Sequence, residues 1–191
     1  MEKRNVVLAS SSPRRRELLE AAGLRFIVDP ANIPEDMRGR HSAAQLVKKL
    51  AFEKAAAVAA RHPGAIIIGA DTVVAIGKHR WSKPESKREA RMMLRELSGK
   101  THQVWTGFCV IDTKSGRRIL KAVSSKITLR PLSAKTIERH IATGEALEGA
   151  GGYMIQKRGA AFIARVDGDY TNIIGLPLGT LLNELSKFGV K

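Results

Sequence analysis

The stretch "AIIIGADTVVAIG", residues 65–77, constrains the fold more than any other part of the chain. It holds two apolar runs, and between them stand Gly69, Ala70, Asp71 and Thr72. Short apolar runs rich in β-branched residues are typical of buried strands. A carboxylate in such surroundings loses its hydration, so it needs a cation or hydrogen-bond donors to remain ionised. The stretch therefore predicts a buried sheet with one acid set into it.

Two interpretations of Asp71 remain open from this pattern. In the first, Asp71 lies in a turn between two strands and hydrogen-bonds its own backbone. In the second, it lies at a strand end as a metal ligand or general base, because open α/β sheets bind ligands at strand ends. Glu35 raises the same choice: it is either a solvated acid of the polar loop 31–41 or a second functional carboxylate.

Strand and helix patterns interleave along the whole chain. They predict one α/β domain over residues 1–191, with two lobes, a mixed twisted sheet and helices on both faces. The expected strands are 5–10, 25–30, the two runs of 65–77, 102–112, 117–129 and 160–170. The expected helices are 12–22, 42–61 (capped by Ser42 and Gln45), 85–98 (begun by Pro84), 134–143 and 174–189.

The segment "SSSPRRR" places three arginines at the start of the first helix. Ser12 favours the N-cap and Pro13 the first helical position. Arg14, Arg15 and Arg16 then stand where the helix dipole is already positive, which is unfavourable unless an anion joins them. A bound phosphate resolves this conflict; a capped surface helix with solvated arginines is the alternative. Successive helical residues rotate around the axis, so Arg14 or Arg15 would bind and Arg16 would be exposed.

Further cations and one amide complete the candidate set. Lys54 lies among small residues, which predicts a covered stem and a directed ammonium group. Lys83 precedes Pro84. With the arginines and acids, these lysines favour a divalent cation and basic side chains around a polyphosphate. Gln156, in a late glycine-rich segment, has an amide able to read a base edge; a plain hairpin and turn is the alternative there.

Composition excludes several classes of protein. Lys and Arg number 33 against 18 Asp and Glu, a net charge of +15 that predicts either polyanion binding or a solubilising surface. Aromatic residues are 5%, which argues against a base-stacking single-strand binder. Cys109 is alone, and the five histidines lack ligand spacing. No apolar run approaches the roughly 20 residues of a membrane span or resembles a signal peptide, so a soluble cytoplasmic protein is expected.

Several ordered motifs then resemble one family nearly end to end, from Leu8 to Leu178. They are "LASSSPRRRELL", "EKA", "IGADTVV", "KP", "LSGKTHQVWTG", "GGYMIQ" and "GDYTNIIGLPL". The chain resembles the Maf family of nucleoside triphosphate pyrophosphatases. The resemblance implies a Maf/Ham1 (ITPase-like) fold with two lobes around a cleft. It also implies cleavage between the α and β phosphates, a divalent cation such as Mg²⁺ or Mn²⁺, and a homodimer.

The resemblance also implies roles for individual residues. Asp71 matches the family's proton acceptor, which activates water. Glu35 matches an acid that helps Asp71 to hold the metal. The residues that match substrate-binding positions are Ser10, Arg14, Arg15, Lys54, Thr72, Lys83 and Gln156.

The resemblance extends to the base of the nucleotide. Arg14, Thr72 and Gln156 match the triplet of the dTTP/UTP branch rather than the 7-methyl-GTP branch, so dTTP, UTP and modified pyrimidine nucleotides are the expected substrates. The departures from the family pattern are Pro34, Ser82 and Lys157, and they bear on base preference.

A second hypothesis is a basic nucleic-acid-binding or septum-formation regulatory protein without catalysis. It would use the same cationic patch, and steep salt dependence of DNA affinity would support it. Asp71 favours the enzyme, because a polyanion binder gains nothing from a buried acid.

Overall fold

A computed structural model describes residues 4–39 and 41–190. Among these, a seven-stranded sheet has the order β2-β1-β3-β5-β6-β7, with β4 paired to β3. The strands are β1 (Val6–Leu8), β2 (Ile27–Val28), β3 (Ile66–Ile76), β4 (His79–Trp81), β5 (Thr101–Asp112), β6 (Arg118–Leu129) and β7 (Ile163–Asp167). The helices are α1 (Pro13–Ala21), α2 (Ala43–Ala59), α3 (Lys87–Leu97), α4 (Ala134–Ala142), α5 (Tyr170–Ile174) and α6 (Leu178–Ser186), with short 3₁₀ turns at Glu145–Leu147, Ala150–Gly152 and Arg158–Phe162.

The sheet is mixed, as the sequence predicts. Strand β1 is parallel to β2 and β3, whereas β4 is antiparallel to β3 and β7 is antiparallel to β6. The chain divides into two compact units, described separately below. The first comprises Met1–Asp71, Thr106–Val123 and Gly175–Lys191, and the second Thr72–Trp105 and Ser124–Ile174.

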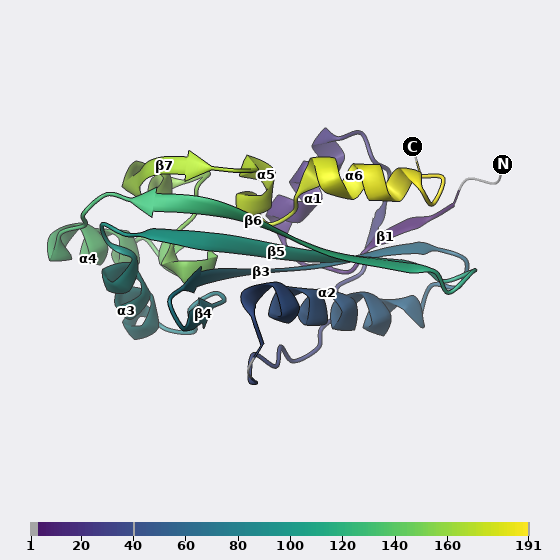
Figure 1. The fold of residues 1–191 in the computed structure, drawn as a ribbon, viewed down its shortest axis with the longest axis horizontal. Helices are drawn as coiled ribbons and strands as arrows, with labels where there is room; N and C mark the ends of the chain where they lie inside the picture. Colours follow the sequence, from purple (N-terminus) through teal and green to yellow (C-terminus); the bar gives the residue numbers. More distant parts are fainter. Residues whose placement is uncertain (1–3, 40, 191) are drawn as a thin grey trace. The chain divides into compact units, whose positions relative to one another are not determined.

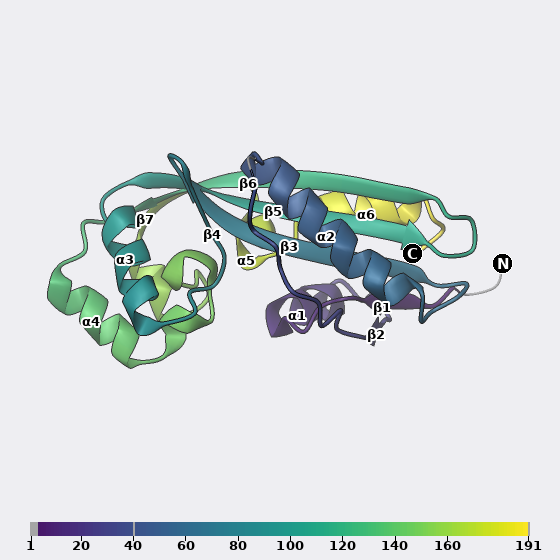
Figure 2. The same ribbon diagram turned by 90° about the horizontal axis from the view of Figure 1, so that it is seen from below.

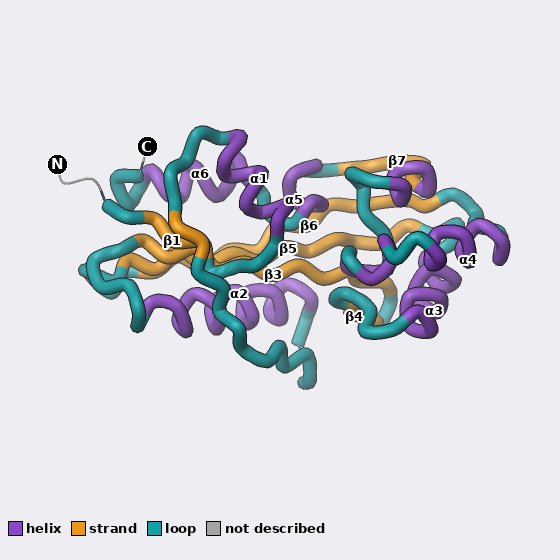
Figure 3. Tube along the Cα trace, turned by 180° about the vertical axis from the view of Figure 1, so that it is seen from behind, coloured by secondary structure: helices purple, strands orange, loops and turns teal. Residues whose placement is uncertain are grey.

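The first unit has three layers. Figure 1 shows α1 and α6 on one face of its strands and α2 on the other, and Figure 3 shows the same from behind. Side chains alternate between the faces, as strand geometry requires. Leu8 and Ile68 pack with the α1 and α6 side, whereas Val7 and Ile67 pack with Ala55 of α2. Helices on both faces of the sheet are therefore confirmed in this unit.

Helix α2 lies directly against the strands because two glycines allow it. A Cβ at Gly69 of β3 would lie 2.3 Å from the Ala51 carbonyl oxygen, and one at Gly107 of β5 would lie 2.4 Å from the Val47 carbonyl oxygen. Real Cβ atoms do not approach so closely, so only glycine permits this packing. The helix begins with the predicted capping box of Ser42 and Gln45.

Strand β3 contradicts the position that both interpretations gave to Asp71. The strand runs unbroken from Ile66 to Ile76, and Asp71 is the sixth of its eleven residues. It lies neither in a turn nor at a strand end. The small residues before it serve the close approach of α2, and β3 remains a neighbour of β5 in the sheet. A glycine that admits a helix and a glycine that makes a turn look alike in sequence.

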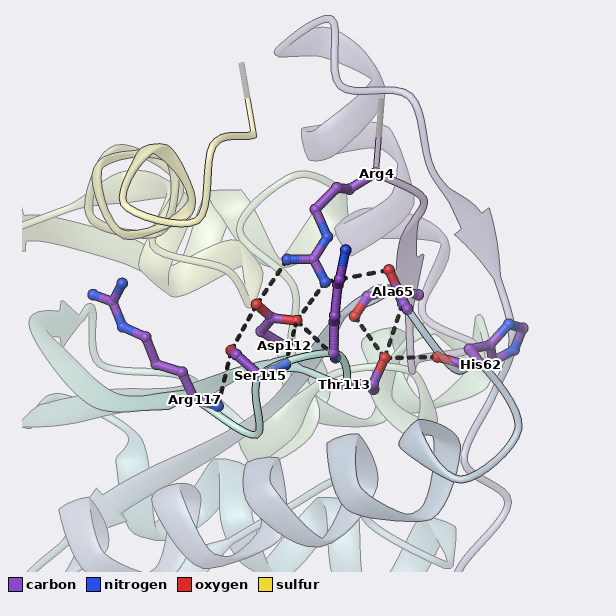
Figure 4. Close-up of polar contacts among 9 residues, drawn as sticks. Arg4, His62, Ala65, Asp112, Thr113, Ser115 and Arg117 are labelled. Atoms are coloured by element: carbon purple, nitrogen blue, oxygen red, sulfur yellow. Dashed lines mark hydrogen bonds and ion pairs between the residues drawn. The ribbon is translucent and has the colours of Figure 1, made fainter. Parts of the chain in front are cut away.

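A polar network ties the start of β1 to the β5–β6 hairpin (Figure 4). The Arg4 guanidinium donates to both carboxylate oxygens of Asp112, and Asp112 also accepts from the Lys114 N–H at 2.8 Å. The hydrogen bonds from Arg4 hold the pKa of Asp112 well below its usual range. Thr113 Oγ1 donates to the His62 carbonyl oxygen at 2.9 Å. These contacts close one end of the first unit and have a structural role.

The second unit has its own core. Helices α3 and α4 gather beside its strands (Figure 2), and Met93, Leu97 and Ile137 pack there with Tyr153 and Phe162. Helix α3 begins at Lys87 with Ser86 as N-cap, and the Ser86 hydroxyl accepts from the Glu89 N–H at 3.1 Å.

The prediction that Pro84 begins helix α3 is therefore wrong. Ser86 caps the start of the helix instead. Its hydroxyl accepts a hydrogen bond from an N–H group of the first turn, whereas a proline at the first helical position only lacks an N–H group and accepts none. Among the described residues, no helix is long and apolar enough to cross a membrane.

Candidate active site

The alternation of β3 directs Asp71 toward α2. Ile67 packs among the α2 residues, and Gly69 contacts Ala51 and Ala55, so Asp71 follows on the same face. Lys54 precedes Ala55 on α2, and its Nζ lies 2.6 Å from Asp71 Oδ1. The close approach of helix and strand thus sets this contact, and the directed ammonium group expected of Lys54 is confirmed.

Lys54 also binds a second acid. Glu35, in the loop between β2 and α2, accepts from the same Nζ at 2.6 Å through Oε1. The side chains of Lys54 and Asp71 are 12% and 5% exposed, whereas that of Glu35 is 37% exposed. One ammonium group therefore bridges a solvent-facing carboxylate and a buried one.

The buried carboxylate has an altered proton affinity. Burial raises the pKa of Asp71 above its ordinary value; the charges of Lys54 and Arg15 oppose this shift, and that of Glu35 adds to it. Asp71 Oδ2 is buried and has no hydrogen-bond partner among the described residues. A carboxylate with one oxygen held and the other available to accept a proton has the geometry of a general base.

The arginine-rich first turn of α1 is not simply solvated, because one of its arginines is buried. Arg15 is buried, and it donates from Nε to the Gly175 carbonyl oxygen at 2.8 Å and from Nη1 to Ser10 Oγ at 3.0 Å. Burial lowers the pKa of this guanidinium, while the charge of Asp71 raises it. Arg16 is exposed, as predicted, and it pairs with Glu20 at 2.7 Å.

One detail of that turn departs from expectation. Ser12 occupies the N-cap and Pro13 follows it, but the Ser12 side chain makes no capping hydrogen bond. Ser10 Oγ instead accepts from the Ser12 N–H at 3.3 Å. The first turn of α1 thus lacks the acceptor that an N-cap serine usually provides. Arg14, which belongs to this turn, is half-buried.

The structure brings Ser10 and Arg15 into one set of contacts and Glu35, Lys54 and Asp71 into another, both within the first unit. Arg14 also belongs to the first unit, whereas Thr72, Lys83 and Gln156 belong to the second, and the roles of these four residues stay predictions. Thr72 is partly buried on β3, Lys83 is exposed before the buried Pro84, and Gln156 is exposed in a turn. Lys157, one of the departures from the family pattern, pairs with Glu148 at 2.9 Å.

Several buried polar residues of the second unit escaped the sequence analysis. Glu145 accepts from the backbone N–H groups of Arg158 and Gly159. Asn172 Nδ2 donates to the Val104 carbonyl oxygen at 3.1 Å. Burial lowers the pKa of His102 to about 4, so its ring is neutral at physiological pH. His102 and Asn172 lie in the motifs "LSGKTHQVWTG" and "GDYTNIIGLPL", but nothing in the sequence marks these residues as buried, because burial depends on packing by distant segments.

A divalent metal, which the family implies, can be tested against this chemistry. Among the described residues, no group of three or more His, Cys, Asp or Glu is arranged to hold a metal. Mg²⁺, however, commonly uses one or two carboxylates and takes its other ligands from water and substrate phosphates. Glu35 and Asp71 supply these two carboxylates, which Lys54 holds together. The residues present therefore fit such an ion.

These features define the class of protein: a mixed α/β protein with a buried carboxylate among cationic side chains, a chemistry suited to phosphoryl groups. The chain belongs to the Maf family, since the family model described as Maf-like protein matches residues 5–188.

Curated relatives align with nearly the full chain. The dTTP/UTP pyrophosphatase of Desulforamulus reducens is 42% identical over 188 residues, 98% of both chains. That of Pelotomaculum thermopropionicum is 44% identical over 97% of both chains, and that of Geobacter sulfurreducens is 42% identical over 99% of both. A solved HAM1 protein from Coxiella burnetii is similar with a TM-score of 0.48 and 11% identity, covering 97% of this chain and 98% of its own.

Proposed function

We propose that this chain is a nucleoside triphosphate pyrophosphatase that hydrolyses dTTP and UTP to the monophosphate and pyrophosphate. The observation that carries the proposal is Asp71: a buried carboxylate with a raised pKa, held on Oδ1 by Lys54 and unpartnered on Oδ2 among the described residues. Relatives at 42–44% identity named dTTP/UTP pyrophosphatase support the choice of substrate.

Asp71 acts on water in the proposed reaction. Its Oδ2 takes a proton from a water molecule as the water oxygen forms a bond to the α-phosphorus. The bond between the α-phosphorus and the oxygen that bridges to the β-phosphorus breaks, and pyrophosphate leaves with that oxygen. Lys54 holds the carboxylate in place through Oδ1, so the accepting oxygen keeps a fixed direction.

The cations stabilise the charge that develops on the phosphates. Arg14, Lys54 and Lys83 are the proposed phosphate-binding groups. Arg15 spends donors on Gly175 and Ser10, so its proposed role is to fix the first loop and add positive charge beside the phosphates. Ser10 is proposed to contribute a hydroxyl there, and Thr72 and Gln156 are proposed to select the base.

A divalent cation, Mg²⁺ or Mn²⁺, completes the proposal. Glu35 and Asp71 would hold it, and when bound it neutralises phosphate charge and lowers the pKa of water. We further propose that the two units act as one functional domain in a cytoplasmic homodimer. Light scattering on the purified chain would test the dimer.

The deciding experiment is pyrophosphate release from a panel of nucleoside triphosphates, with Mg²⁺, with Mn²⁺ and with a chelator. We expect release from dTTP and UTP above the other bases, and loss of release in the chelator. The proposal would be overturned in favour of a nucleic-acid-binding role if the protein released no pyrophosphate and its affinity for DNA rose steeply as the salt concentration fell.

A further inference from the structure

Three buried side chains hold the segment that carries Gln156. At its start, His140 Nε2 donates to the Gly152 carbonyl oxygen at 3.0 Å, and His102 Nε2 is hydrogen-bonded to the Tyr153 hydroxyl at 2.6 Å. At its end, Glu145 is bonded to the backbone. All of these groups belong to the second unit. The segment is therefore fixed at both ends by polar groups inside the core.

Glu145 is the strongest of these anchors. Its residue is 7% exposed, and its two oxygens accept from consecutive backbone N–H groups: Oε2 from Arg158 at 3.1 Å and Oε1 from Gly159 at 2.9 Å. Hydrogen bonds to an ionised acceptor are stronger than those between neutral groups. Neither histidine contact fixes two backbone groups at once.

The turn between the anchors is closed on itself. The Lys157 N–H donates to the Met154 carbonyl oxygen at 3.4 Å. A Cβ at Gly159 would lie 2.6 Å from that same oxygen, so the backbones of Met154 and Gly159 are in direct contact. Gln156 is exposed on this short turn, next to the buried Ile155. The backbone position of Gln156 therefore depends on the hydrogen bonds by which Glu145 holds the backbone N–H groups of Arg158 and Gly159.

We propose that Glu145 is a positioning residue for base selection: by holding the turn of Met154–Gly159, it sets the backbone position from which Gln156 presents its amide. The inference rests on the proposed function, in which Gln156 reads the base. An amide discriminates bases only when its donor and acceptor are fixed, because a mobile amide satisfies the wrong base as readily as the right one.

The test is Glu145→Gln, with Glu138→Gln as the matched control. Glu138 belongs to the same unit and pairs with Arg91 at the surface of α4, so its substitution removes an equal charge away from the turn. The amide introduced by Glu145→Gln keeps one acceptor but turns an NH₂ group against a backbone N–H. For this variant we expect the ratio of kcat/KM for dTTP over dATP to fall about tenfold. The fall should come through KM for dTTP, with kcat within about threefold; the control should keep the wild-type ratio.

A merely structural role predicts a different result. Loss of folded protein lowers kcat for every nucleotide equally and leaves the ratio unchanged. Glu145→Asp, which keeps the charge but is one methylene shorter, should show an intermediate ratio and serves if Glu145→Gln does not fold. Amide hydrogen exchange should accelerate at Arg158 and Gly159 in either variant.

An unchanged ratio in a folded, active variant overturns the inference alone. A wild-type protein that hydrolyses no triphosphate overturns the proposed function and the inference with it.

Discussion

Two buried carboxylates, one in each unit, have opposite surroundings. Glu145 has both oxygens bonded to backbone N–H groups, so both oxygens hold the turn. Asp71 has one oxygen bonded to Lys54 and the other without a partner among the described residues. A buried carboxylate with both oxygens hydrogen-bonded stabilises the structure. One with an oxygen that lacks a hydrogen-bond partner can accept a proton in a reaction. The pairing of oxygens, more than burial, separates the two roles.

Asp71→Asn is the variant for which we expect the largest effect. The amide cannot accept the proton of water, so kcat should fall by about 10²- to 10⁴-fold. The free energy of unfolding should hold or rise, because the substitution removes a buried charge that burial disfavours. Pyrophosphate release and urea unfolding measure the two effects. Wild-type kcat in the folded variant would remove Asp71 from the proposed chemistry.

Lys54→Met tests how the charge of Lys54 affects the pKa of Asp71. It leaves Asp71 without its nearest cation, and removing one partner of a buried pair costs about 3–5 kcal/mol. The pKa of Asp71, already raised, should rise further, because the Lys54 charge lowers it in the native chain. Asp71 acts as a base only when ionised, so kcat/KM falls as pH drops through this pKa.

The acid limb of the pH profile is the readout for Lys54. The wild-type limb should lie above the ordinary value for aspartate, about 3.9, and the limb of the variant higher still. Lys100→Met is a suitable control, since Lys100 pairs with Glu96 in the second unit and neither of the two is a candidate site residue. Limbs at the same pH in wild type and Lys54→Met would contradict this account.

Gly69→Ala probes how the backbone delivers the lysine to the acid. The new Cβ would lie 2.3 Å from the Ala51 carbonyl oxygen, so α2 must move and Lys54 with it. Overpacking of this kind costs about 1–3 kcal/mol. Gly179→Ala is the control, because nothing lies within 4 Å of its Cβ. Thermal unfolding compares the two; equal stability would show that β3 and α2 separate without penalty.

Local patterns predicted much of the fold. The capping box of Ser42 and the exposure of Arg16 depend on neighbouring residues and were predicted correctly. The place of Asp71 was not, because Gly69 admits a helix from elsewhere in the chain. Sequence analysis also missed Glu145, since its partners lie 13 and 14 residues away.

The most direct measurement is a titration of the Asp71 carboxyl carbon by ¹³C NMR, assigned by comparison with Asp71→Asn. The account predicts a pKa above the ordinary value for aspartate, with Asp29 as an internal contrast, because Arg61 and His62 lower its pKa to about 2. A pKa of Asp71 at or below that of an exposed aspartate would contradict the claim that this carboxylate is kept available to accept a proton.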